Sequence, residues 1–160
     1  MFDTRNDLSA DSRAKAIRLL NARLADAIDL GLQAKHAHWN VKGPHFIALH
    51  ELFDKLAGKI GEHVDTIAER VTALGGTAGG TLGAVVRATS VPAYPETISD
   101  GLAHVEALAG AVADFGRKAR LGIDEAEELG DADTADLLTQ VSRETDKQLW
   151  FLEAHLHAQR

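Results

Sequence analysis

The feature that most constrains this chain is an apolar stripe between His45 and Leu74. Its members recur at steps of 4, 3, 4, 4, 3, 4 and 3 residues, the spacing of one face of an α-helix. They are Leu49, Phe53, Leu56, Ile60, Val64, Ile67, Val71 and Leu74. A stripe of this length predicts one long helix with a continuous buried face, and Gly75 and Gly76 predict where that helix ends.

A helix is also predicted before this stripe. Ser9 suits a helix N-cap, and the apolar residues that follow it recur at spacings of three and four, so the helix should run to about Asn40. Gly43 and Pro44 then break the pattern, because proline disfavours helical geometry in the residue before it and suits the first turn of a new helix.

Two further long helices are predicted in the second half of the chain. Pro95 is expected to open the first of them, with inward-facing residues from Ile98 to Phe115. An acidic link from Asp124 to Asp133 should lead into the last helix, whose inward-facing residues are Leu138, Val141, Leu149, Leu152 and Leu156.

The segment between Gly75 and Pro95 is rich in Gly, Thr, Ser and Pro, and it is longer than a tight helical connection needs. Leu82, Val85 and Val86 within it predict one short helix. The sequence has no strand pattern, so the fold class is all-α. We predict a four-helix bundle with a short extra helix in the long connection between helices 2 and 3.

Length and charge narrow the possible functions. A chain of 160 residues can bury its own core, so we expect one domain over residues 1–160, with residues 1–10 as a short N-terminal arm. Residues 1–7 lack the basic head and apolar run of a signal peptide, and no apolar run is long enough to span a membrane, so we expect a cytoplasmic protein. The formal net charge of −7 disfavours phosphate backbones and favours cations.

A second face of the 45–74 helix carries metal-binding groups. At about 100° per residue from His50, Asp54, Asp65 and Glu69 fall at about 40°, 60° and 100°, whereas the apolar stripe centres near about −80°. Gly58 and Gly61 share the polar face. Each glycine costs about 1 kcal/mol in a helix interior, so we expect them to admit the close approach of another backbone.

Helix geometry requires two copies of this face to complete a site. His50 and Asp65 lie 15 residues apart, about 22 Å along one helix, whereas metal ligands converge within about 2.5 Å of the ion. Two such helices packed antiparallel about a two-fold axis, crossing near Gly58, would bring His50 of each copy beside Asp65 of the other. Mixed imidazole and carboxylate ligands suit iron, zinc or manganese, and they do not choose among these metals.

The residues also resemble a known family, the Dps family of ferritin-like mini-ferritins. The resemblance extends from about Ile17 to His155. It is carried by residues 35–51 (KHAHWNVKGPHFIALHE), 65–70 (DTIAER), 74–77 (LGGT), 133–136 (DTAD) and 146–153 (DKQLWFLE).

This resemblance implies a ferritin-like four-helix bundle that assembles into a dodecamer from two-fold dimers. It implies a ferroxidase that oxidises Fe²⁺ at sites between subunits, with hydrogen peroxide as the expected oxidant, stores the ferric mineral in the shell and so protects DNA from oxidative damage. By resemblance, one subunit binds iron through His38, His50 and Asp54. Its neighbour completes the site with Asp65 and Glu69, and Trp39 lies against the site. Entry pores form near the start of the last helix in this family, which makes Asp133 and Asp136 candidates.

The sequence departs from the best-known members of this family at its N-terminus. The first twelve residues hold only Arg5 against Asp3, Asp7 and Asp11, so the Lys-rich arm that binds DNA is missing and direct DNA binding is doubtful. Two other functions stay open: a DNA-coating nucleoid protein with weak or zinc-occupied metal sites, and a plain helical interaction domain. The remaining histidines are expected at the surface or in interfaces: His36, His45, His63, His104, His155 and His157.

Overall fold

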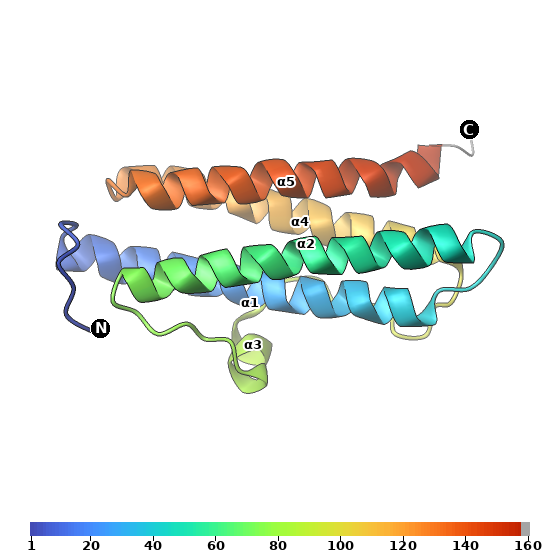
Figure 1. The fold of residues 1–160 in the computed structure, drawn as a ribbon, viewed down its shortest axis with the longest axis horizontal. Helices are drawn as coiled ribbons and strands as arrows, with labels where there is room; N and C mark the ends of the chain where they lie inside the picture. Colours follow the sequence, from blue (N-terminus) through green and yellow to red (C-terminus); the bar gives the residue numbers. More distant parts are fainter. Residues whose placement is uncertain (158–160) are drawn as a thin grey trace.

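The computed structural model describes residues 1–157, so the last three residues of the expected 1–160 domain lie outside it. The described chain forms α1 (Ala10–Asn40), α2 (Phe46–Ala73), α3 (Leu82–Ala88), α4 (Gly101–Glu128) and α5 (Ala132–His157). The four long helices lie side by side in an elongated bundle, in which α1 pairs with α2 and α4 with α5 (Figure 1). This confirms the all-α, ferritin-like four-helix bundle with a short helix between the second and third long helices.

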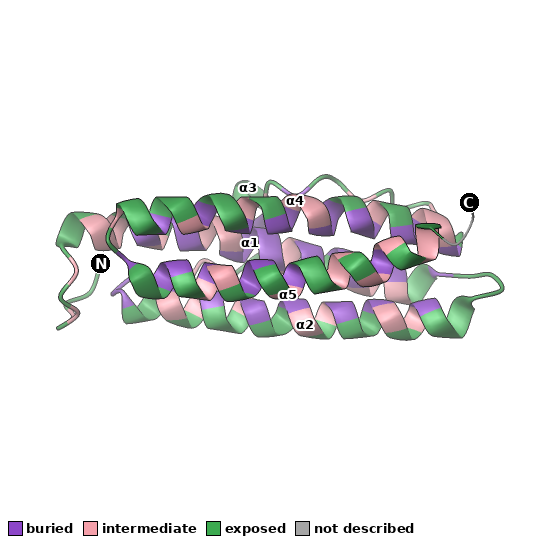
Figure 2. Ribbon diagram, turned by 90° about the horizontal axis from the view of Figure 1, so that it is seen from above, coloured by how far each residue is buried: buried purple, intermediate pink, exposed green. Residues whose placement is uncertain are grey.

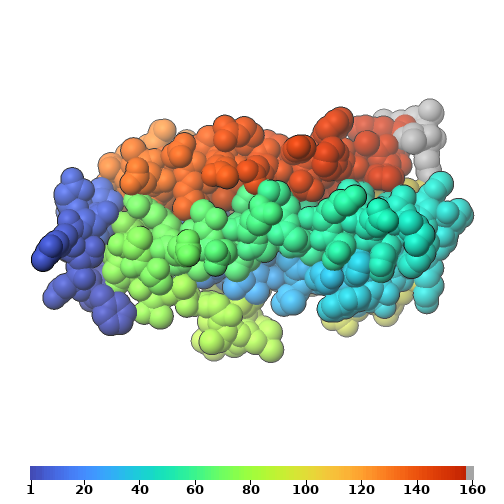
Figure 3. All heavy atoms as spheres, in the orientation of Figure 1, coloured from blue at the N-terminus to red at the C-terminus, as the bar shows by residue number. Residues whose placement is uncertain are grey.

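The short helix α3 lies outside the bundle. It packs beside α1 and protrudes from one face of the molecule (Figure 3). The segment that follows α3 then travels along the bundle to the end where α1 meets α2 (Figure 1). There the Lys42 N–H donates to the Ser99 carbonyl at 2.9 Å, so the long connection is fixed to the α1–α2 turn. Residues 1–157 contain one isolated β-bridge, between Lys42 and Asp100, and no β-strand.

A side-chain cap and two glycine turns mark the start of α1 and both ends of α2. The Ser9 hydroxyl accepts a hydrogen bond from the Ser12 N–H, as predicted for the N-cap of α1. Gly43, with φ of 113°, makes the turn into α2, and Gly75, with φ of 84°, ends that helix. The Phe2 N–H donates to the Gly75 carbonyl at 2.6 Å, so the N-terminal arm packs against the end of α2.

The predicted bounds of the third long helix were wrong at both ends. Its start is at Gly101 and not at Pro95, because the Asp100 side chain caps it by accepting from the Leu102 and Ala103 N–H groups. The segment 124–133, predicted as an acidic link, is helical as far as Glu128. Ala126 is buried there against Leu138, so packing of the inner face prevails over the charged outer face.

The core lies along the inner faces of the four long helices, as Figure 2 shows by burial. Every member of the α2 stripe is buried except Val64, which is half-buried. Phe53 and Phe115 are the largest fully buried side chains, and each contributes about 1.5–3 kcal/mol through burial of apolar area. No helix within residues 1–157 is long and apolar enough to cross a membrane.

Candidate metal centre

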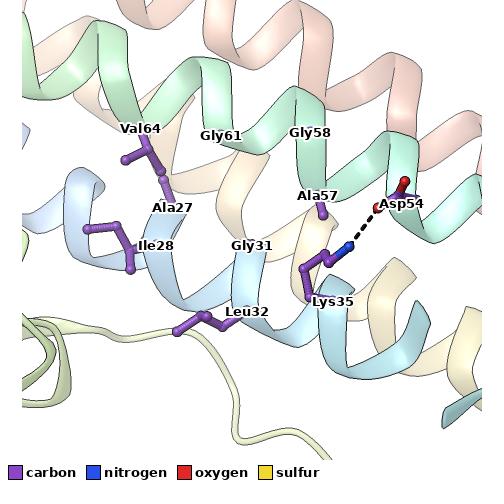
Figure 4. Close-up of a pocket in the computed structure, with 10 residues that line it drawn as sticks. All are labelled: Ala27, Ile28, Gly31, Leu32, Lys35, Asp54, Ala57, Gly58, Gly61 and Val64. Atoms are coloured by element: carbon purple, nitrogen blue, oxygen red, sulfur yellow. Dashed lines mark hydrogen bonds and ion pairs between the residues drawn. The ribbon is translucent and has the colours of Figure 1, made fainter. Parts of the chain in front are cut away.

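An open groove separates α1 from α2 on the side of the pair that faces away from the core. It encloses about 490 Å³ and is mainly apolar, and Lys35 and Asp54 mark one end of it (Figure 4). Its lining residues are Ala27, Ile28, Gly31, Leu32, Lys35, Asp54, Ala57, Gly58, Gly61 and Val64. Leu32 is 52% exposed. The groove is therefore an apolar surface that nothing within the described chain covers.

Two histidines are held together near this end, where α1 finishes and α2 begins. His38 Nδ1 lies 2.8 Å from the His50 carbonyl oxygen, and His50 Nδ1 lies 2.8 Å from the His38 carbonyl oxygen. The rings stack, with centroids 3.7 Å apart and planes inclined by 24°. Because a carbonyl oxygen can only accept, each Nδ1 carries the hydrogen. A ring that carries only this one hydrogen has its Nε2 lone pair available for a metal ion.

Asp54 lies one helical turn after His50 and is exposed. Its Oδ1 is 2.7 Å from Lys35 Nζ, the contact drawn in Figure 4. The Lys35 hydrogen bond and charge lower the pKa of Asp54 below its ordinary value of 3.8, and the charges of His38 and His50 act in the same direction. Asp54 is therefore an anionic ligand candidate beside two imidazoles, balanced in this chain by a single ammonium group.

Trp39 follows His38 and is 66% exposed. Lys35 Nζ lies 5.6 Å from the centroid of a Trp39 ring, within the range of a cation–π contact. The sequence had not singled out Lys35. It stands one turn before His38 on α1, so a helical-wheel view of α1 would have placed its ammonium group beside the ligand candidates.

The other two predicted ligands, Asp65 and Glu69, are exposed further along α2. Neither carboxylate takes part in an ion pair within residues 1–157, and they do not join the His38–His50–Asp54 group. In the same part of the chain, no three His, Asp or Glu side chains converge on a position that could hold a metal ion. One chain thus presents two separate sets of ligand candidates on one surface.

Gly58 and Gly61 lie between the two sets. A Cβ added at either position would meet no atom within 4 Å. Packing within the described chain therefore does not require glycine at these positions.

A buried ion pair fastens the far end of α2 to the start of α5. Arg70 Nη2 lies 2.6 Å from Asp131 Oδ1, and the Asp131 side chain is only 1% exposed. Asp131 also accepts from the Thr134 N–H, so it caps α5. The two candidate pore residues, Asp133 and Asp136, are both exposed beside this joint.

The expectation that all remaining histidines lie at the surface or in interfaces was wrong for two of them within this chain. His63 is 4% exposed and His104 is 0% exposed. Burial lowers the pKa of both rings. The signal for His104 was in the sequence, because it lies four residues, about one helical turn, before Leu108, a member of the inward stripe.

Comparisons with known proteins agree with this architecture. A family model described as a ferritin-like domain matches residues 17–160. The DNA protection during starvation protein of Agrobacterium fabrum is 48% identical over 153 residues, which cover 96% of this chain and 94% of that protein. The protein of the same name from Mycolicibacterium smegmatis is 34% identical, over 93% of this chain and 81% of its own length. The solved structure of DpsA14 from Streptomyces coelicolor superposes with a TM-score of 0.91 at 37% identity, covering 96% of this chain and 90% of that one.

Proposed function

The chain belongs to the Dps family of ferritin-like proteins, and we propose that it is an iron-storing ferroxidase whose sites form between two copies of the chain. The observation that carries this proposal is the reciprocally hydrogen-bonded pair His38–His50 beside Asp54, on the surface that also bears Asp65 and Glu69. Each copy supplies His38, His50 and Asp54 to one site. It supplies Asp65 and Glu69 to the other site.

The donor set fits Fe²⁺ as the substrate. Two imidazole nitrogens provide neutral ligands, while the carboxylates supply negative charge that favours the more highly charged Fe³⁺ product. Two Fe²⁺ ions each give one electron to hydrogen peroxide, whose O–O bond breaks to give two hydroxide ions. Zinc or manganese would satisfy the same donor types, and they are the alternatives that a metal-binding experiment must compare.

In this proposal, the Lys35 ammonium group supplies the positive charge beside Asp54 that a bound metal ion would otherwise supply. This group neutralises Asp54 in the single chain. A dication brings twice the charge to the same carboxylate and adds imidazole ligation, so its arrival displaces Lys35 Nζ. The hydrogen bonds at His38 Nδ1 and His50 Nδ1 keep the two rings in place during this exchange.

The apolar groove supports the two-copy arrangement. Its walls, lined by Leu32, Ala57 and Gly58, expose apolar area next to the ligand candidates, and a second copy would cover that area. We propose that such dimers build a dodecameric shell that stores the ferric mineral, and that Asp133 and Asp136 line an entry route which concentrates Fe²⁺ by its negative charge.

We further propose that the shell acts in the cytoplasm and protects DNA by consuming iron and peroxide. Direct coating of DNA is not favoured, because the net charge is −7 and the N-terminal arm is hydrogen-bonded through Phe2 to the end of α2. A gel-shift assay at two salt concentrations tests this part: phosphate-driven binding would weaken steeply as salt rises.

Stopped-flow oxidation of Fe²⁺ by hydrogen peroxide tests the site. We expect His50→Ala and Asp65→Ala each to slow oxidation by at least about tenfold, since each removes a ligand. His45→Ala, which changes an exposed histidine just before α2, is the matched control and should keep the wild-type rate. Wild-type rates in both ligand variants would contradict the assignment.

A further inference from the structure

A second cluster of polar side chains lies on the other side of α1. Tyr94, in the segment between α3 and α4, is the only tyrosine of the chain. Its hydroxyl lies 2.6 Å from Nδ1 of His104 on α4, and the two rings stack with centroids 6.0 Å apart. His36 from α1 packs on Tyr94 with the two ring planes inclined by 66°, and Phe53 from α2 packs near His104. Elements from four parts of the chain therefore enclose one phenol–imidazole pair.

The surroundings keep both partners of this hydrogen bond neutral. Burial raises the pKa of Tyr94, so the phenol keeps its proton. Burial, followed by the charge of His36, lowers the pKa of His104, which is 0% exposed, so the imidazole is neutral and can accept a proton. In the tautomer that carries its hydrogen on Nε2, His104 Nδ1 accepts the hydrogen bond from the Tyr94 hydroxyl. After a proton transfer, the Asp100 charge would stabilise the imidazolium, since it favours the protonated form.

We propose that Tyr94 and His104 form a redox-active pair that quenches one-electron oxidants. Tyr94 loses one electron, its O–H bond breaks, and a new N–H bond forms at His104 Nδ1. The pair becomes a neutral phenoxyl radical and an imidazolium. The oxidant is a radical of the hydroxyl class, which takes the electron and becomes hydroxide. Fe²⁺ then returns one electron to the phenoxyl, becoming Fe³⁺, while His104 returns the proton.

The need for His104 follows from the acidity of an oxidised phenol. A phenol that loses an electron becomes a strong acid and must release its proton to a base within hydrogen-bond distance. His104 Nδ1 is the hydrogen-bond partner of the Tyr94 hydroxyl in the described chain. A tyrosine that only packed in the fold would need no base, so dependence on His104 separates a redox role from a structural one.

The position of the pair connects it to the candidate metal centre. His36, whose ring contacts Tyr94, stands two residues before His38 and so lies on a different face of α1. The pair and the candidate metal centre therefore lie on two faces of one helix, and an oxidant that escapes the centre arises across α1 from a side chain that can quench it. This assignment of the oxidant's source rests on the proposed ferroxidase function. The redox property of the pair does not.

The experiment uses iron-free, full-length protein, so that it does not depend on the metal centre. Azide radicals made by pulse radiolysis serve as the one-electron oxidant, and the tyrosyl radical is followed by its optical absorption and by freeze-quench electron paramagnetic resonance. Trp39 and Trp150 are exposed and compete for the oxidant, so the protein carries Trp39→Phe and Trp150→Phe. We expect a tyrosyl signal that is absent after Tyr94→Phe.

The role of His104 is tested in the same background with His104→Gln, which keeps a polar side chain of similar length. Radical formation should slow by at least about tenfold, because the proton loses its acceptor. If this variant does not fold, the solvent deuterium isotope effect on radical formation at Tyr94 replaces it, and a rate that is slower in D₂O is expected. The proposal would be overturned by the lack of a tyrosyl signal, or by an unchanged rate of radical formation in a folded His104→Gln protein. Where the isotope effect is the test, an equal rate in H₂O and D₂O would overturn it.

An iron-loaded measurement then separates this proposal from the ferroxidase function. Tyr94→Phe should oxidise Fe²⁺ at the wild-type rate while releasing more hydroxyl radical to a spin trap. Loss of Fe²⁺ oxidation in His50→Ala with an intact tyrosyl signal would support both assignments separately. If Tyr94→Phe releases no more radical than wild type in an active shell, the pair does not quench the oxidants of this reaction.

Discussion

Removal of Asp131 should destabilise the chain more than removal of its neighbour Asp133, although both lie near the same arginine. Asp131 is 2.6 Å from Arg70 Nη2 and 1% exposed, whereas Asp133 is 3.5 Å from Arg70 Nη1 and 83% exposed. Asp131→Ala leaves the Arg70 charge without its buried partner, which costs about 3–5 kcal/mol. It also removes the N-cap of α5, worth about 1 kcal/mol, while Asp133 compensates part of the lost ion pair. We therefore expect a net loss of about 3–5 kcal/mol.

Thermal unfolding of the assembled protein, at one fixed protein concentration, measures this difference. For a chain of this size, 1 kcal/mol shifts Tm by about 2–4 °C, so Asp131→Ala should lower Tm by about 6–20 °C. Asp133→Ala is the matched control, and its exposed ion pair is worth less than about 1 kcal/mol. Equal shifts in Tm for the two variants would contradict this prediction, because they would show that burial does not decide the strength of this contact.

Three further predictions concern burial, assembly and iron entry. Burial lowers the pKa of His63 from 6.5, so the unfolded chain binds that proton more readily and stability falls as the pH drops below about 6.5. His63→Leu should reduce the loss of Tm between about pH 7.5 and about pH 5.5, and the same change at exposed His45 should not. Gly58→Leu should break the assembly into smaller species in analytical ultracentrifugation, while Gly110→Leu, at an equally open helical position, should leave it intact. Asp133→Asn combined with Asp136→Asn should slow iron uptake, and uptake at the wild-type rate would exclude the proposed entry route.

The sequence predicted most of the fold because a single period dominates it. The apolar stripe of α2 predicted that helix and its buried face. The other face was therefore predicted to lie outside the bundle of one chain, and it carries His50, Asp54, Asp65 and Glu69. The same helix geometry separated these residues into two sets, and the structure places them in two sets. Periodicity is sufficient here because the ligand candidates lie on one continuous helix or at its junction with α1.

Features that depend on contacts between distant segments were not predictable in this way. Pro95 is a good helix start by itself, but Asp100 caps α4 with two hydrogen bonds and prevails. The Lys35–Asp54 pair depends on the register of α1 against α2, and the Tyr94–His104 pair depends on where the long connection crosses the bundle. Neither register follows from the spacing of residues within one element.

Mixing two inactive variants tests whether each site is shared between two copies. His50→Ala and Asp65→Ala are expressed together so that they assort at random into dimers. A mixed dimer has one site with both defects and one site with none, and half of the dimers are mixed. Peroxide-driven Fe²⁺ oxidation should therefore return to about a quarter of the wild-type rate. A mixture no faster than either variant alone would contradict the account, because it would place all ligands of each site within one chain.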